Sequence, residues 1–191
     1  MFFLRELRPA FSLVVLFTLF LGFLLPEAFT GAIQLALPFQ ANGSLLKNNG
    51  EIVGSALIGQ NFTDAKYFQG RPSALDKPYD AATSGASNLG PTSAALQTAI
   101  AQRVAAYQKA FGPGPVPADA VTASGSGLDP DISLANALRQ APAVAAARHL
   151  PAATVTALVQ KLTHHSVLGV IGTDHVNVLQ LNLALDKLSA S

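Results

Sequence analysis

An apolar run near the N-terminus constrains this chain more than any other feature. From Ala10 to Leu25 the sequence reads AFSLVVLFTLFLGFLL, without a charged residue. A helix rises about 1.5 Å per residue, so about 20 apolar residues cross the roughly 30 Å hydrocarbon core of a bilayer. Residues 9–30 meet that length. We therefore predict a single transmembrane helix over 9–30, in contact with membrane lipid.

The charges that flank this run predict its orientation. Arg5 and Arg8 precede it, whereas the far side carries Glu27 and no Lys or Arg before Lys47. By the positive-inside rule, residues 1–8 stay in the cytoplasm. Residues 31–43 then form a connector, and residues 44–191 form a domain on the opposite side of the membrane.

A cleaved signal peptide is the alternative interpretation of the same run. Arg5 and Arg8 resemble the basic region of a signal peptide, which an apolar stretch follows. The segment Thr30-Gly31-Ala32 is a mediocre cleavage site, however, and the apolar run is long for a signal peptide. These two points favour a retained helix.

Composition excludes several functions. Lys and Arg total 12 and Asp and Glu total 11, so the formal net charge is +1. Nucleic-acid binding depends on clustered Lys and Arg, and the sequence has no such cluster. The chain has no Cys, which excludes a disulfide scaffold, a thiolate metal site and a Cys nucleophile.

Beyond the connector, the pattern predicts an α+β fold: one mixed domain with a small sheet and about three to four helices. Asn49-Gly50 is a hairpin turn signal between two short strands, the second of which extends as far as Ile58. Residues 59–91 form a long loop rich in Gly, Pro and Ser. From Thr92 to Phe111, apolar residues recur with helical spacing, and Gly112 suits the helix end.

Three further elements are expected toward the C-terminus. Asp129 suits a helix N-cap and Pro130 the first helical position, for a helix that extends to about His149. Pro151 opens another helix. Residues 176–185 alternate between apolar and polar types, which favours a strand over a helix.

Catalytic motifs do not emerge from the sequence. There is no phosphate-binding G-x-x-x-x-G-K-[ST] loop, and Ser124-Gly125-Ser126-Gly127 has the wrong spacing for a nucleophile elbow. The adjacent His164 and His165 would point about 100° apart on a helix, so they predict no metal site. For a membrane-anchored hydrolase, the alternative function, the least poor candidates are Ser126, His149 and Asp129.

Arg71 stands out in the long loop, because Tyr67 and Phe68 precede it and few other cations lie nearby. In a structural role it would pack on aromatic rings and donate hydrogen bonds to loop carbonyls. In a functional role it would bind a carboxylate of a partner. Asn88 is expected to hold its own loop through a side-chain turn bond.

Several segments in chain order carry a resemblance that covers essentially the whole sequence. They are Gly54–Gln60, Tyr67–Ala74, Ser84–Pro91, Val116–Asp119, Thr122–Pro130 and Val176–Leu185. In these segments the chain resembles the C subunits of bacterial Kdp-type potassium-transporting ATPases. Departures from the family pattern include Asp131, where His is usual, Leu134, where Pro is usual, and Thr173-Asp174-His175, where Pro-Arg is common.

The resemblance implies a non-catalytic subunit of the inner membrane with a periplasmic main domain. Its partners would be a channel-like A subunit, a P-type ATPase B subunit and a small F subunit. The implied role is to stabilise assembly and, as a catalytic chaperone, to raise the ATP affinity of the B subunit, with ATP in a ternary complex. The orientation predicted above favours the assembly role, since ATP is cytoplasmic. Candidate partner contacts are Tyr67, Phe68, Arg71, Ser87, Asn88 and Asp129; no catalytic or metal site is implied.

Overall fold

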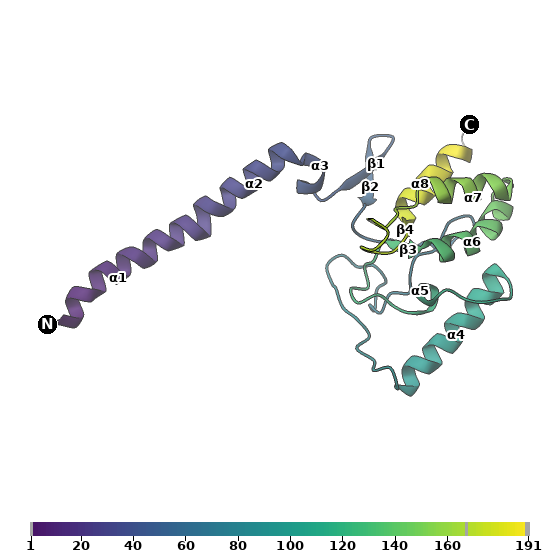
Figure 1. Ribbon diagram of the computed structural model, residues 1–191, viewed down its shortest axis with the longest axis horizontal. Coiled ribbons are helices and arrows are strands. Elements are labelled where there is room, and N and C mark those ends of the chain that lie inside the picture. The colour runs from purple at the N-terminus through teal and green to yellow at the C-terminus, as the bar shows by residue number, and fades with distance from the viewer. Residues whose placement is uncertain (1, 167, 190–191) are drawn as a thin grey trace. The chain divides into compact units, whose positions relative to one another are not determined.

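The computed structural model of the chain describes residues 2–166 and 168–189 (Figure 1). The chain divides into two compact units, Met1–Leu45 and Leu46–Ser191. The boundary lies after the N-terminal helices, the last of which ends at Ala41, and next to the first residue of a strand that begins at Leu45.

The first unit is one long helical stretch followed by a short helix. Its elements are α1 (Phe2–Leu19), the π-helical turn η1 (Phe20–Leu24), α2 (Leu25–Ala36) and α3 (Pro38–Ala41). By length and composition, the 32 residues of Arg5–Ala36 form a candidate membrane span, and its most apolar stretch is not buried inside the protein. The predicted span of residues 9–30 lies within this helix, and residues 31–36 continue it.

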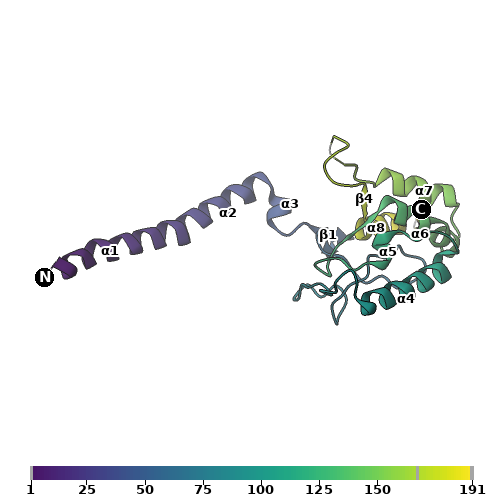
Figure 2. The same cartoon turned by 60° about the horizontal axis from the view of Figure 1, so that its bottom comes forward.

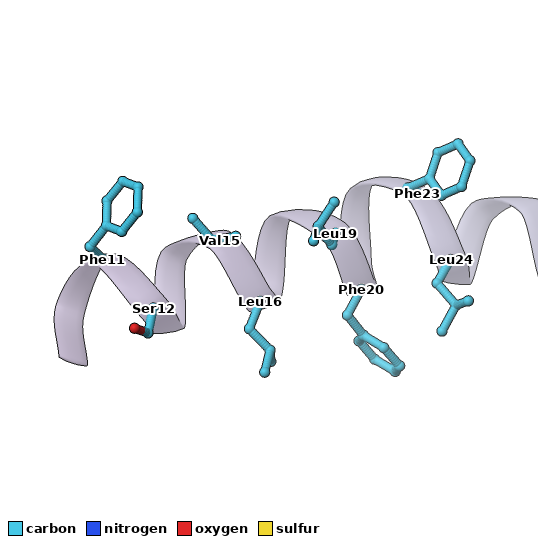
Figure 3. Close-up of a pocket in the computed structure, with 8 residues that line it drawn as sticks. All are labelled: Phe11, Ser12, Val15, Leu16, Leu19, Phe20, Phe23 and Leu24. Carbon is cyan, nitrogen blue, oxygen red and sulfur yellow. The ribbon is translucent and has the colours of Figure 1, made fainter. Parts of the chain in front are cut away.

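The π-helical turn has a local cause. Pro26 has no N–H, and its ring would press on the carbonyl four residues back in a regular α-helix. The helix widens just before this point, where the N–H of Leu25 donates to the carbonyl of Phe20, five residues back. Apolar side chains extend from both sides of this helix: Phe11 and Phe23 on one side, Leu16 and Phe20 on the other (Figure 3). A helix that is apolar on every side suits a lipid environment.

The second unit is a mixed α/β region with two small sheets, as the sequence predicts. Its strands are β1 (Leu45–Asn48), β2 (Glu51–Ser55), β3 (Asp131–Ser133) and β4 (His175–Asn177). Its helices are α4 (Ala94–Phe111), α5 (Ala118–Val121), α6 (Leu134–Ala147), α7 (Ala152–Lys161) and α8 (Val178–Ser189). Strand β1 pairs with β2, and β3 pairs with β4.

Two sequence predictions are confirmed closely. Asn49 and Gly50 have φ values of 51° and 87° between β1 and β2, the combination that a two-residue hairpin turn needs. The second strand ends at Ser55, however, and does not reach Ile58. Helix α4 spans almost the predicted range and ends at Gly112, whose φ is 89°.

The predicted helix start at Asp129 is wrong, because a short strand intervenes. Residues Asp131–Ser133 form β3, and α6 begins after it. Ser133 is the true N-cap: its hydroxyl oxygen accepts a hydrogen bond from the N–H of Asn136 at 3.1 Å. The carboxylate of Asp129 is thereby left for another role.

The predicted strand over residues 176–185 is also wrong after its first two residues. Strand β4 ends at Asn177, whose side-chain oxygen accepts from the N–H of Gln180 at 3.1 Å and so caps α8. In the helix, Leu181 and Leu185 are four residues apart and both are fully buried. The alternating pattern is therefore compatible with a helical core face, and the Asn cap decides between the two.

The core of the second unit lies where β3 and β4 meet helices α6, α7 and α8 (Figure 1). The strands are antiparallel, with Ile132 opposite Val176, and both side chains are buried. Helix α7 packs against α6 and α8 and contributes Val155 and Val159. Phe68, from the long loop, completes this core.

Candidate functional site

The segment around Phe68 is held by two side-chain amides instead of a neighbouring strand. Asn182 of α8 accepts from the N–H of Phe68 at 2.9 Å and donates to its carbonyl at 3.0 Å. Gln140 of α6 accepts from the N–H of Gln69 at 2.8 Å and donates to its carbonyl at 3.1 Å. An amide offers both a donor and an acceptor, so each copies the edge of a β-strand. Both amide side chains are almost fully buried.

The two aromatic residues of the predicted contact set lie in this segment. Phe68 is fully buried in the core of the second unit. The hydroxyl of Tyr67 donates to Asp186 at 3.1 Å, and the Arg148 guanidinium lies 4.8 Å from the centre of its ring. Arg148 also pairs with Asp186 at 2.7 Å. These contacts fix the ring of Tyr67 against α8.

Arg71 and Asp129, two further predicted site residues, meet in an ion pair. The Arg71 Nη1 atom lies 2.8 Å from Asp129 Oδ2. The Nη2 atom of Arg71 donates to the carbonyls of Thr122 and Ala123 at 3.4 and 3.5 Å. The expected hydrogen bonds of Arg71 to backbone carbonyls are therefore present, and its main partner is a carboxylate of the same chain.

Tyr79 is a central residue of this site that sequence reasoning missed. Its hydroxyl donates to the carbonyl of Arg71 at 2.5 Å. Burial raises the pKa of Tyr79 to about 12, and the nearby Asp129 carboxylate adds to this rise. Its φ of 61° is unusual for an aromatic residue, and no sequence motif signals such a conformation.

Two glycines make room for the Tyr79 side chain. A Cβ atom on Gly59 would lie 2.4 Å from a ring carbon of Tyr79, and one on Gly70 would lie 2.4 Å from its hydroxyl oxygen. Real Cβ atoms do not approach other atoms so closely. Glycine at these two positions is thus a requirement of the packed ring.

The long loop is also fastened to the segment that precedes Asp129. The N–H of Gly59 donates to the carbonyl of Leu128 at 2.8 Å, and the hydroxyl of Ser73 donates to that of Gly127 at 2.8 Å. The N–H of Gly85 donates to the carbonyl of Ser126 at 2.9 Å. Three consecutive residues, Ser126–Leu128, therefore supply the carbonyl acceptors, which explains how a loop of this length keeps a defined path.

A second polar cluster joins α4, α5 and α6. The carboxylate of Asp119 accepts from the N–H and hydroxyl of Ser133 at 2.8 and 2.9 Å, and from the side chain of Asn136 at 3.0 Å. The hydroxyl of Tyr107 donates to Asn136 at 2.8 Å, and burial raises the pKa of Tyr107. This cluster fixes α4 to the core.

A cavity of about 350 Å³ lies between the long loop and α4. Arg71, Tyr79, Arg103 and Tyr107 are among its lining residues. Arg103 donates to the carbonyl of Val121 at 3.0 Å, and Arg71 is paired with Asp129. Both guanidinium groups at the cavity are thus engaged by the protein itself.

Ser87 and Asn88 lie in the exposed part of the long loop. Asn88 has a φ of 53°, a left-handed conformation that Asn tolerates better than most residues. Among the described residues 2–166 and 168–189, no hydrogen bond of the Asn88 side chain is found. The predicted side-chain turn bond therefore does not account for this loop. Tolerance of positive φ explains Asn at this position instead.

The three hydrolase candidates do not form a catalytic arrangement. Ser126 accepts from the N–H of Leu128, and Asp129 pairs with Arg71. His149 is exposed just beyond the end of α6, with a φ of 57°. In the part of the chain that the structure describes, no hydrogen bond joins Ser126, His149 and Asp129 to one another, and no cluster of three His, Asp or Glu that could hold a metal is found.

The fold is that of an α/β protein with an apolar N-terminal helix of membrane-spanning length. Its α/β unit is built around one long loop that is fixed by side chains. The family model for "K+-transporting ATPase, c chain" matches residues 7–187. The chain is 55% identical over 190 residues to the potassium-transporting ATPase KdpC subunit of Gemmatimonas aurantiaca, covering 98% of this chain and 96% of that one. The corresponding subunit of Allorhizobium ampelinum is 52% identical, with 98% and 99% covered. The chain therefore belongs to the KdpC family of potassium-transporting ATPase subunits.

Replacement of Tyr79 by Phe tests the fastening of the loop. The variant removes the donor to the Arg71 carbonyl, and an unmet polar group of this kind costs about 1–3 kcal/mol. We expect the free energy of unfolding of the full chain in detergent to fall by about 1–2 kcal/mol. Tyr67→Phe is the matched control and should cost less, because its acceptor Asp186 is 39% exposed. Equal stability of Tyr79→Phe and the wild type would contradict the assignment.

The departure at Asp131 predicts a pH effect on stability. Burial raises the pKa of Asp131, although His175, 4.0 Å away, opposes this rise. A raised carboxyl pKa means that the folded state holds the proton more tightly than the unfolded state. The stability from this group is present below the unfolded pKa and is lost as the pH rises through the folded pKa.

The Asp131→Asn variant cannot ionise at this position, so it does not lose stability as the pH rises. Its amide oxygen can still accept a hydrogen bond from Asn177. We expect the variant to gain stability relative to the wild type at about pH 7 and to gain less at about pH 3. Chemical denaturation at both pH values measures this difference. A gain that is larger at the lower pH would show that Asp131 is not destabilised by ionisation.

Proposed function

We propose that this chain is a non-catalytic subunit that stabilises the assembly of a potassium-transporting ATPase. The proposal is carried by the polar side chains of the second unit, which bind other parts of the same chain. Arg71, Asp129, Tyr79, Asn182 and Gln140 are all engaged in fixing one long loop to the second unit. Side chains used in this way build a rigid surface, which is what an assembly subunit presents to its neighbours. Membership of the KdpC family supports the same role.

The partners proposed are the channel-like A subunit, the P-type ATPase B subunit and the small F subunit. Ser87 and Asn88 are exposed, and Arg71 and Asp129 lie partly at the surface, with side chains 25% and 28% exposed. Of the six predicted contact residues, these four are the ones that we propose touch a partner directly. Phe68 would act indirectly, because it is buried and holds the loop in place.

The proposed orientation places residues 1–8 in the cytoplasm and the second unit in the periplasm. Arg5 and Arg8 support it, because basic residues beside a membrane span favour the cytoplasmic side. In this arrangement the second unit and cytoplasmic ATP lie on opposite sides of the inner membrane.

An effect on the ATP affinity of the B subunit would then act through assembly and not through nucleotide held by this chain. The residues of the cavity beside α4 fit a triphosphate poorly. Of its two arginines, Arg71 pairs with Asp129 and Arg103 donates to a backbone carbonyl, so binding phosphate would mean breaking these contacts. We therefore propose that the catalytic-chaperone role is an indirect one.

Co-purification tests the assembly role. A tagged full-length chain, extracted in mild detergent from cells that make the other subunits, should elute with them in gel filtration. Ser126→Ala serves as the discriminating variant, since it removes only the hydroxyl proposed for the alternative hydrolase. We expect this variant to assemble and to support ATP hydrolysis by the complex as the wild type does. Migration of the wild-type chain alone would refute the proposal.

Cysteine labelling tests the orientation. Because the chain has no Cys, single Glu6→Cys and Glu51→Cys variants give unambiguous sites, and both positions are exposed. In intact spheroplasts, an impermeant thiol reagent should label Cys at position 51 and leave position 6 unlabelled until the membrane is broken. The reverse pattern would place the second unit in the cytoplasm.

A further inference from the structure

The loop between α7 and β4 exposes three large aliphatic side chains. Leu168, Val170 and Ile171 are 88%, 82% and 65% exposed. They lie within four consecutive residues, Leu168–Ile171, which we term the apolar loop. Figure 2 shows that the described residues between α7 and β4 extend away from the body of the second unit. Such a cluster of exposed apolar side chains is typical of an interaction site.

The two ends of this segment are clamped together. His164 and His175 exchange backbone hydrogen bonds of 2.8 and 3.1 Å. Asp174 accepts from the N–H of Ser166 at 2.9 Å through one oxygen, and its other oxygen lies 2.9 Å from Nδ1 of His165. The neck is therefore built of specific polar contacts, and the apolar side chains are held clear of it.

The backbone of the apolar loop has positive φ values that hold these side chains in an exposed position. Leu168 and Gly169 have φ values of 55° and 72°, and Gly172, directly after the apolar loop, has 84°. A left-handed conformation is costly for leucine, and such strain is typical of sites that bind a partner. A loop that is already in its bound shape loses less conformational entropy on binding.

The chemistry around the apolar loop distinguishes between a lipid surface and a protein. Loops that enter a membrane surface use aromatic side chains and basic residues that attract anionic headgroups. Between Lys161 and Lys187 the sequence contains no aromatic Phe, Tyr or Trp and no Lys or Arg. The ionic neighbours of the loop base are Asp131 and Asp174, whose ion-pair partners are histidines. This composition favours an aliphatic groove on a protein.

We propose that the apolar loop docks into an aliphatic groove on another subunit of the transport complex. The inference rests on the proposed assembly function and names a surface through which it acts. It adds an apolar contact to the polar surface around Arg71 and Ser87.

Polar replacement of the loop tests the proposal. The double variant Leu168→Ser, Val170→Ser removes two apolar contacts without touching the clamped neck. In the full-length chain, we expect at least a tenfold loss of the other subunits on co-purification, with an unchanged unfolding midpoint of the chain alone. Leu57→Ser is the matched control, because Leu57 is 63% exposed but lies outside the loop, and it should retain the complex. Wild-type retention by the double variant, or equal loss by the control, would overturn the proposal.

A fluorescent probe separates the two kinds of partner. A Val170→Cys variant carries the chain's single thiol and accepts an environment-sensitive dye. The emission should shift to the blue in the assembled complex and stay unshifted for the same chain alone in lipid nanodiscs. A shift in nanodiscs alone would assign the loop to the membrane, and no shift in either would show that it stays in water; both results overturn the proposal. Failure of the wild-type chain to co-purify would instead refute the assembly function itself.

Discussion

The second unit depends on two buried amides, those of Asn182 and Gln140. Each satisfies both the N–H and the carbonyl of one residue in an irregular segment that pairs with no strand. Without these bonds, the two buried backbone groups of Phe68 and the two partly buried groups of Gln69 would lose their partners. A buried polar group without a partner costs about 1–3 kcal/mol. With them, a loop residue becomes part of the core shared by α6, α7 and α8.

From this fixed point the remaining contacts of the loop follow in order along the chain. Arg71 comes three residues after Phe68 and reaches Asp129, and the hydroxyl of Tyr79 returns to the Arg71 carbonyl. Gly85 then bonds to Ser126 in the same segment that Gly59 and Ser73 contact. The loop is thus bonded at intervals to helices and to a neighbouring loop, so its long irregular path is well defined. Long loops with such ties are commonly interaction surfaces.

Local signals in the sequence predict those elements that local chemistry decides. Asn49-Gly50 fixes the hairpin and Gly112 ends α4, because positive φ at those positions favours these residues. The start of α6 and the nature of α8 were harder, since Ser133 and Asn177 each end a three-residue strand and cap the helix that follows. A strand so short leaves no period to detect. The role of Tyr79 cannot be predicted from the sequence, because it depends on contacts with two distant glycines and a carbonyl that only the tertiary structure brings together.

The arrangement separates two tasks that one surface could not combine easily. Side chains that hold the long loop must be engaged within the chain, so they cannot also be free to bind a partner strongly without loosening the unit. Exposed aliphatic side chains have no such conflict, because Leu168, Val170 and Ile171 make little contribution to the fold. Their burial against a partner would therefore add to the binding free energy without weakening the unit. Polar contacts around Arg71 would then fix the register of an interface, while the apolar loop supplies much of its affinity. In the proposed assembly role, this division would allow a unit with few charged residues to bind its partners specifically.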